Sequence, residues 1–126
     1  MNDADLIHAL NDAVGRNDLH TFVEGMRSDA VWEHNPGTGS PEEGVYKGRE
    51  EIGALFSRVL EGWEYLRPVA TEIDEIEPGT YRVRGELHCM VKGTETEIVE
   101  HYEQRLEIRD GLMGRMRMVI GTTAYG

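Results

Sequence analysis

Residues 31–49 read Val-Trp-Glu-His-Asn-Pro-Gly-Thr-Gly-Ser-Pro-Glu-Glu-Gly-Val-Tyr-Lys-Gly-Arg, and they contain a predicted strand, a loop and the start of a predicted helix. The start of this stretch completes a short predicted strand, residues 30–34, which breaks at Asn35-Pro36 because proline supplies no backbone N–H for a ladder. A loop rich in glycine and proline follows, and at Gly48 the chain enters a predicted helix. Aromatic side chains and one imidazole, that of His34, gather around this loop. We therefore expect it to form the mouth of a small-molecule pocket.

The composition is that of one folded domain. A chain of 126 residues is long enough for a hydrophobic core without disulfides or metals, so we expect a single domain over residues 1–126. No run approaches the roughly 20 apolar residues of a membrane-spanning helix. The single cysteine, Cys89, has no partner for an internal disulfide, and the acidic N-terminus lacks the basic and apolar regions of a signal peptide. These features predict a cytoplasmic protein.

Charge argues against two classes of partner. Thirteen Lys and Arg residues against 24 Asp and Glu residues give a net charge of −11 at pH 7. Such a chain repels phosphate backbones and anionic lipid surfaces. We therefore expect neither nucleic acid nor a membrane as a partner.

Helical periodicity appears three times in the first half of the chain. Apolar residues recur at helical spacing over residues 3–14, over a short segment that begins at residue 17 or 18, and over residues 48–60. Asp3 is the predicted N-cap of the first helix. The third segment is the clearest helix, because its apolar residues follow the spacing i, i+3, i+4, i+7 and i+8.

After Gly62 the apolar period changes to two, which indicates strands. Four strands are predicted, over residues 63–73, 81–91, 96–109 and 113–121, with turn signals between them. Pro68 indicates that the first of them is an edge or a bulged strand. One face of this antiparallel meander is apolar, and the helices must cover it. The order predicts an α+β fold, a cone-shaped roll in which three N-terminal helices pack on a strongly curved, mainly antiparallel sheet around a cavity.

Two motifs and this order of elements carry a resemblance to a known family. The motifs are Asn35-Pro36-Gly37 followed by residues 44–50, and Leu-Glu-Ile-Arg-Asp-Gly at residues 106–111. Over essentially its whole length the chain resembles the nuclear transport factor 2 (NTF2-like) superfamily, in its SnoaL-like or ketosteroid-isomerase-like branch. That fold hosts isomerases, cyclases, dehydratases, epoxide hydrolases and plain binding or assembly modules. The resemblance also implies a homodimer through the outer face of the sheet.

At the positions that carry chemistry in these relatives, the chain departs from the family pattern. Ketosteroid-isomerase-like enzymes end their first strand with a general-base aspartate, and alignment places His34 there. Their oxyanion-hole acid corresponds to Gln104. The epoxide hydrolases of this fold carry an acid in the last strand, where this chain has Met116, Arg117 and Met118. The resemblance therefore implies the fold but no particular reaction.

We predict that His34, Glu100 and Gln104 are the catalytic residues. If Leu106 and Ile108 face the cavity, the period of two turns Gln104 and Glu100 inward as well. The imidazole would then move a proton, Glu100 would orient it or share its proton, and Gln104 would polarise a carbonyl. The alternatives are a histidine that only shapes the entrance, a solvated glutamate and a glutamine that only satisfies its own hydrogen bonds.

The predicted cavity wall is apolar and rich in aromatic and methionine side chains. The predicted ligand-binding residues are Trp32, Tyr46, Phe56, Trp63, Tyr65, Leu87, Tyr102, Met116 and Met118. Small-molecule sites are built in this way, so we expect a small, largely apolar molecule that contains a carbonyl group. The five histidines do not have metal-site spacing, and we expect neither a metal nor another cofactor.

The leading hypothesis is a SnoaL-like pocket enzyme, a cofactor-independent isomerase, cyclase or lyase of the dehydratase type that acts on a small apolar carbonyl compound. The alternative is a non-catalytic module of the same fold that binds a small molecule or serves dimerisation. A cone filled by side chains would favour the dimerisation module. Substrate and reaction type stay open at this point.

Overall fold

The computed structural model describes residues 2–121, which form helices on one face of a single sheet. The helices are α1 (Asp3–Gly15), α2 (Leu19–Glu24) and α3 (Gly48–Glu61). The strands are β1 (Met26–His34), β2 (Gly44–Lys47), β3 (Trp63–Glu77), β4 (Thr80–Val91), β5 (Glu97–Arg109) and β6 (Leu112–Ile120). They lie in the order β2-β1-β6-β5-β4-β3. Only β1 and β6 run parallel among these neighbours, so the described sheet is mainly antiparallel.

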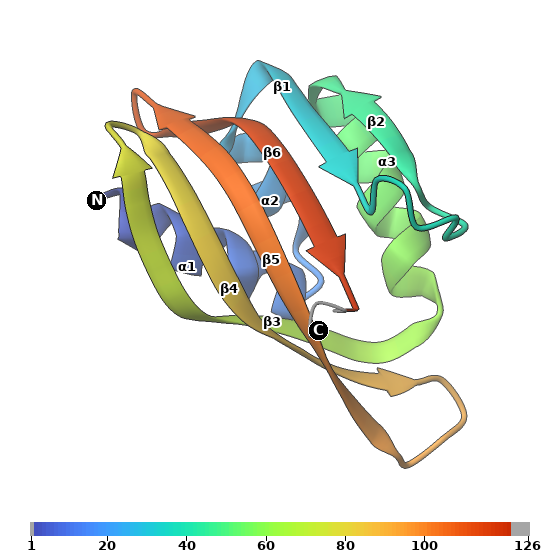
Figure 1. Cartoon of the computed structure of the whole chain (residues 1–126). Helices are drawn as coiled ribbons and strands as arrows, with labels where there is room; N and C mark the ends of the chain where they lie inside the picture. Colours follow the sequence, from blue (N-terminus) through green and yellow to red (C-terminus); the bar gives the residue numbers. More distant parts are fainter. Residues whose placement is uncertain (1, 122–126) are drawn as a thin grey trace.

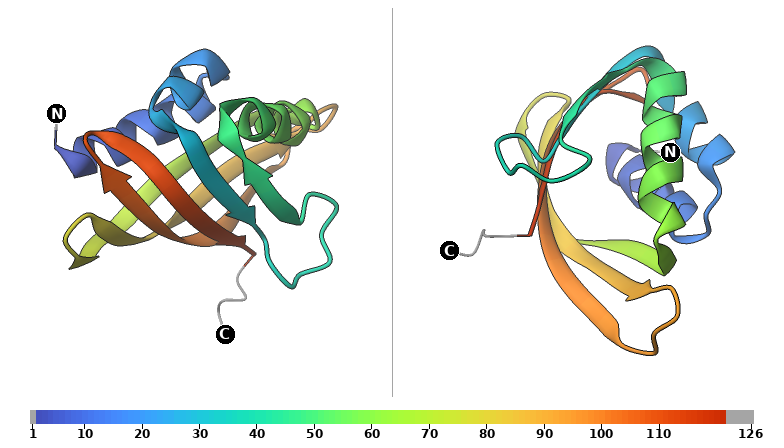
Figure 2. Two further views of the ribbon diagram at one scale, coloured as in Figure 1. Left: turned by 90° about the horizontal axis from the view of Figure 1, so that it is seen from above. Right: turned by 90° about the vertical axis from the view of Figure 1, so that its right-hand side faces the viewer.

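The sheet is curved and open, and the three helices lie on the same side of it (Figures 1 and 2). Helix α1 packs against β3 at one edge, and α3 packs against β1 and β2 at the other. The buried apolar side chains fill the space between these two layers. The predicted α+β roll is therefore confirmed. No helix within residues 2–121 is long and apolar enough to cross a membrane.

The N-cap of the first helix lies one residue earlier than the sequence predicts. Asn2 is the N-cap of α1, because its side chain accepts a hydrogen bond from the Asp5 N–H at 2.8 Å. The Asp5 carboxylate accepts in return from the Asn2 N–H at 3.4 Å. This reciprocal arrangement is a capping box. Asp3, the predicted cap, lies inside the helix instead.

The stretch 31–49 contains a strand that the sequence does not predict. Residues Gly44–Lys47 form β2, which pairs antiparallel with Val31–His34 of β1 at the edge of the sheet. Residues 35–43 therefore connect two paired strands. The four-residue strand carries too short a pattern to indicate pairing, and its partner residues lie 10 to 16 positions away in the sequence.

Asn35 ends β1 and ties it to β6. Its backbone is left-handed (φ +47°), a conformation that asparagine tolerates better than most residues. Its N–H donates to the Met118 carbonyl oxygen at 2.8 Å, and its Oδ1 accepts from the Ile120 N–H at 2.8 Å. The Asn-Pro-Gly motif thus sets the position of β1 against β6, which decides where His34 lies.

Candidate functional site

The cone between helices and sheet is largely filled by side chains. It holds a cavity of about 30 Å³, whose wall includes Trp32, Phe56, Gln104, Met116 and Met118. That volume accommodates a water molecule or two. It is far below the roughly 300 Å³ at which small-molecule pockets begin. The open cavity expected from the sequence is therefore not preformed, and a ligand would have to displace side chains.

Four other predicted wall residues, Leu87, Tyr102, Trp63 and Tyr46, do not line this cavity and belong to the surrounding core or its edge. Leu87 and Tyr102 are buried in the core at 3% exposure each. Trp63 and Tyr46 are half-buried and pack against the core at its rim. The Tyr46 hydroxyl donates to the Glu42 carbonyl oxygen at 2.9 Å, which attaches the ring to the loop before β2.

The predicted inward position of Tyr65 is wrong. A register shift between Trp63 and Tyr65 turns Leu66 into the core instead. The Tyr65 hydroxyl donates to the Glu97 carboxylate, and the Arg67 guanidinium lies 4.2 Å from the centre of its ring. Both partners are on the outer face of the sheet. A bulge reverses the alternation of a strand, so counting in twos fails across it.

His34 forms a hydrogen bond that decides its protonation state. The indole Nε1–H of Trp32 donates to His34 Nδ1 at 3.1 Å, inside the core. An indole nitrogen can only donate, so Nδ1 carries no proton and the neutral imidazole carries its proton on Nε2. Burial, at 3% exposure, lowers the pKa of His34, and the charge of Glu42 offsets part of that effect. His34 is therefore held as a neutral hydrogen-bond donor.

This arrangement does not suit the proton-accepting role predicted for His34. The lone pair of Nδ1 is already engaged by Trp32, and Nε2 already carries a proton. That Nε2–H forms no hydrogen bond within residues 2–121. The Nε2–H is thus an unused donor, and His34 itself does not line the 30 Å³ cavity.

Gln104 lies in the same cross-strand row as His34. In the register, His34 of β1 is opposite Met118 of β6, and Met118 is opposite Gln104 of β5. Neighbouring strands are about 4.8 Å apart, so the two Cα atoms are separated by roughly 10 Å. The Gln104 amide is buried, and its Nε2 donates only to the Met118 sulfur at 3.6 Å, a weak acceptor. Met118 thus occupies the space between two polar groups that could share one ligand.

Glu100 is not brought to the other two predicted catalytic residues. It lies four residues from Gln104 along β5, which is roughly 13 Å in an extended strand. β6 ends opposite Tyr102, so Glu100 lies where the hairpin of β4 and β5 extends past that end (Figure 1). The carboxylate whose charge acts on His34 is that of Glu42. The predicted pairing of Glu100 with His34 is therefore wrong.

Asn11 is a polar residue of the cavity that the sequence analysis missed. It lies on α1, lines the cavity, and its Nδ2 donates to the Tyr102 hydroxyl at 3.4 Å. Burial raises the pKa of Tyr102 to about 12, so that hydroxyl stays protonated. Asn11 interrupts the apolar face of α1 between Ile7 and Val14. A polar residue at an inward helical position was the signal available for it.

The buried polar residues of the described chain include no carboxylate. They are His34, Asn35 and Gln104, and Asn35 is engaged in the link between β1 and β6. Within residues 2–121, no three His, Cys, Asp or Glu side chains are close enough to hold a metal ion. The chemistry available inside the cone is therefore hydrogen-bond donation by neutral groups.

Comparisons with known proteins identify the fold and the family. The model of the SnoaL-like domain family matches residues 7–116. TerC, crystallised with polyporic acid, has a TM-score of 0.81 and 22% identity, over 97% of this chain and 93% of that chain. An NTF2-like protein of unknown function from Burkholderia pseudomallei K96243 has a TM-score of 0.82 and 18% identity, over 99% and 95%. A Shewanella denitrificans OS-217 protein, named for its likeness to SnoaL-like polyketide cyclases, has a TM-score of 0.75 and 15% identity, over 97% and 92%.

No curated protein matches the chain. The structural relatives share less than a quarter of their residues with it, so they establish the NTF2-like fold and leave the reaction undecided. The family model covers most of the described chain, from α1 to the middle of β6. The chain therefore belongs to the SnoaL-like domain family.

Proposed function

We propose that this chain binds a small, largely apolar carbonyl compound in its cone and acts on it as a cofactor-independent isomerase or cyclase. The observation that supports this is the pair of buried donors, His34 Nε2–H and the Gln104 amide, on either side of Met118. Within residues 2–121, neither has a strong hydrogen-bond partner. A buried polar group left unpaired costs about 1–3 kcal/mol, which a ligand oxygen would recover.

The two donors would act on the same oxygen. A carbonyl oxygen placed between them accepts one hydrogen bond from His34 and one from Gln104. Both bonds strengthen as negative charge develops on that oxygen during ring closure, when an enol carbon of the same molecule attacks the carbonyl carbon and the enol hydroxyl proton passes to the new alkoxide. The low polarity of the surrounding core increases their effect. The likeness to proteins named for polyketide cyclases is consistent with this class of reaction.

Ligand entry requires Met118 to move. Its side chain lies between the two donors and contacts Gln104 through sulfur. Methionine has three rotatable bonds and adapts to irregular space more readily than branched residues. Met116, next along the inward face of β6, also lines the cavity. Displacement of these two side chains would enlarge the cavity without moving the sheet.

A second candidate function is binding without catalysis. The absence of a carboxylate from the buried polar residues of the described chain favours it, since His34 is held as a donor and no other buried group there is suited to accept a proton. The same donors would then recognise a carbonyl compound without changing it. The two functions share one site and differ only in the fate of the ligand.

A thermal-shift screen of cyclic enones, 1,3-diketones and quinones tests the site. A compound present at 100 times its Kd should stabilise the protein by about 2.7 kcal/mol. Gln104→Leu should abolish most of that gain, whereas His20→Phe, a change of an exposed histidine, should leave it intact. Stabilisation that is equal in wild type and Gln104→Leu would contradict the proposal. Proton and carbon NMR of the recovered compound then separates an enzyme, which returns an isomer of the same mass, from a binding module, which returns the compound unchanged.

A further inference from the structure

Basic side chains are concentrated on the outer face of the sheet, the face that carries no helix. Arg67 lies on this face of β3, and seven more of the 13 Lys and Arg residues of this acidic chain lie on it in β1, β4, β5 and β6. They are Arg27, Arg82, Arg84, Arg105, Arg109, Arg115 and Arg117. All seven are arginines, whose planar guanidinium groups match the geometry of carboxylates and phosphates.

Three of these arginines form one row across the strands. The register places Asp74, Arg82, Arg105, Arg117 and Glu33 side by side on β3, β4, β5, β6 and β1. The ends of the row are ion pairs, Arg82 with Asp74 at 3.6 Å and Arg117 with Glu33 at 3.3 Å. Arg105, in the middle, has an arginine on each side and no ion pair within residues 2–121. Like charges directly opposite each other destabilise a sheet, so this row favours an anion above it.

A hollow of about 360 Å³ lies beside the row. Its wall includes Arg105, Arg115 and Arg117, together with the apolar side chains of Val31 and Val45. Val45 is 53% exposed, so the apolar part of the wall faces solvent. The volume is in the range of small-molecule sites, in contrast to the 30 Å³ inside the cone.

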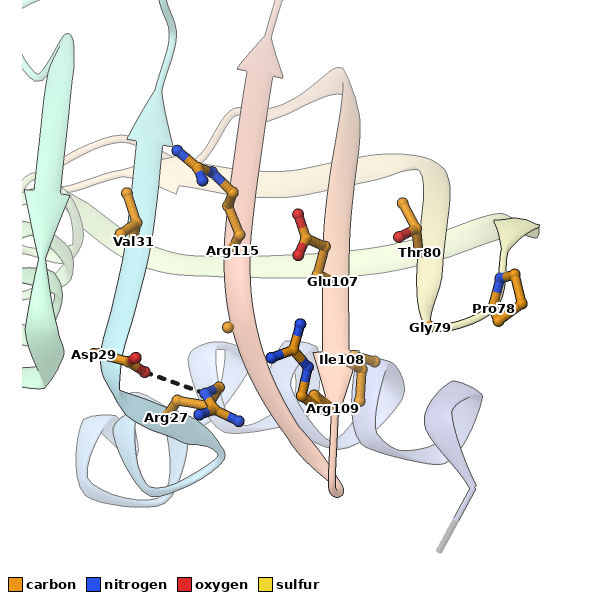
Figure 3. A pocket seen from close by; sticks show the side chains of 11 residues that line it. Arg27, Asp29, Val31, Pro78, Gly79, Thr80, Glu107, Ile108, Arg109 and Arg115 are labelled. Carbon is orange, nitrogen blue, oxygen red and sulfur yellow. Dashed lines mark hydrogen bonds and ion pairs between the residues drawn. The ribbon is translucent and has the colours of Figure 1, made fainter.

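Arg115 is a second guanidinium without an ion pair in this hollow. The register places it opposite Glu107, yet no ion pair joins them within the described residues. Figure 3 shows why, since the guanidinium of Arg115 is turned away from Glu107 and toward β1. The adjoining hollow of about 270 Å³ in that figure shares Val31, Glu107 and Arg115 with the first one. Arg27 in that neighbouring hollow is already paired, with Asp29 at 3.1 Å.

We infer that the 360 Å³ hollow binds an organic anion, with its oxyanion head between Arg105 and Arg115 and its apolar part against Val31 and Val45. Guanidinium groups hold carboxylates and phosphates through paired, charge-assisted hydrogen bonds. The acidic side chains at the rim, Glu33 and Glu107, disfavour anions with several separate charges. The ligand class is therefore a compound with one anionic group on an apolar body.

Calorimetric titration with three naphthalene compounds tests this site. The probes are 2-naphthoate, 2-naphthyl phosphate and the neutral 2-naphthamide. At least one of the two anions should bind, the tighter one identifying the head group, and 2-naphthamide should bind at least tenfold more weakly. Arg105→Gln and Arg115→Gln should each weaken the anion at least tenfold. Arg84→Gln is the matched control, because Arg84 lies on the same face but is paired with Glu103 at 2.9 Å. The affinity of this variant for the anion should differ less than twofold from that of the wild type.

Four results would overturn the inference. If 2-naphthamide bound as tightly as the anions, the charge of the ligand would not be recognised. If Arg84→Gln weakened anion binding as much as Arg105→Gln and Arg115→Gln do, the anion would respond to the overall positive charge of the face and not to a specific site. In NMR spectra of the titration, shifts confined to Trp32 and His34 would place the ligand inside the cone. The homodimer implied by the family resemblance uses this same outer face and stays a prediction. A dimer in sedimentation that binds none of the three compounds would also overturn the inference.

Discussion

Replacing Trp32 by phenylalanine should expose how much the Trp32–His34 hydrogen bond contributes. Phenylalanine keeps an aromatic ring against Phe22 and Phe56, whose ring centres lie 6.0 and 4.8 Å from that of Trp32. It removes the indole N–H that donates to His34 Nδ1 at 3.1 Å, together with part of the ring. The loss of that bond, with Nδ1 left buried and unpaired, costs about 1–3 kcal/mol. The smaller ring adds about 1 kcal/mol of lost packing.

We therefore expect the free energy of unfolding of Trp32→Phe to fall by about 3 kcal/mol, a large part of the 5–15 kcal/mol typical of a domain. Urea unfolding at pH 7, followed by far-UV circular dichroism, measures it. Trp63→Phe is the matched control. Trp63 is half-buried and its indole N–H makes no hydrogen bond within residues 2–121, so its replacement should cost less than about 1 kcal/mol.

A double-mutant cycle separates the hydrogen bond from the packing. His34→Phe alone leaves the Trp32 N–H unpaired, and Trp32→Phe alone leaves His34 Nδ1 unpaired. The double variant leaves neither, so its loss of stability should be smaller than the sum of the single losses by about 2 kcal/mol. Losses that add to within about 0.5 kcal/mol would refute the bond and the tautomer that we derive from it.

Two further predictions concern pH and backbone contact. Burial lowers the pKa of His34 below its usual 6.5, so below pH 6.5 the unfolded chain binds more protons than the folded one, and the free energy of unfolding should fall as the pH drops from 6.5 through the lowered pKa. In urea titrations from about pH 8 to pH 5, His34→Phe should lose less stability over this range than the wild type. An equal dependence of stability on pH in both proteins would contradict the assignment. In Gly85→Ala, the new Cβ would lie 2.2 Å from the Val69 carbonyl oxygen and 2.6 Å from the Tyr102 hydroxyl, so the free energy of unfolding should fall by about 3 kcal/mol. Gly62→Ala is the control, because its Cβ would meet no atom within 4 Å. An equal fall in the free energy of unfolding of both variants would refute the packing argument.

The sequence predicted those elements whose pattern repeats several times. The helix from Gly48 and the strand ending at Arg109 each show four or more apolar residues at the required period, and both appear where expected. The strand at Gly44–Lys47 could not be found in this way, because four residues hold only two alternations and its pairing with β1 depends on distant residues. Long-range pairing is a property of the fold and leaves no local pattern.

The candidate site was predicted in part. His34 and Gln104 both face inward, as expected, whereas the cross-strand row that they share comes from the register of β1, β6 and β5. Glu100 is on the same strand face as Gln104, but a face of a twisted strand is long, and a residue four positions away does not reach the same ligand. The prediction for Tyr65 failed for another reason: Pro68 indicated an edge or bulged strand, but it did not indicate that the bulge lies between Trp63 and Tyr65.

The donor state of His34 and its position depend on different parts of the structure. Trp32 and His34 are two residues apart on one strand, so their side chains share a face and their hydrogen bond is local to β1. The distance from His34 to Gln104, by contrast, is set by the register of β1, β6 and β5, which Asn35 secures at the end of β1. A substitution that shifts β6 would therefore separate the two donors while leaving the tautomer of His34 unchanged. For this reason ligand affinity and the protonation of His34 should respond to different substitutions, and a variant of Asn35 should weaken binding without altering the imidazole.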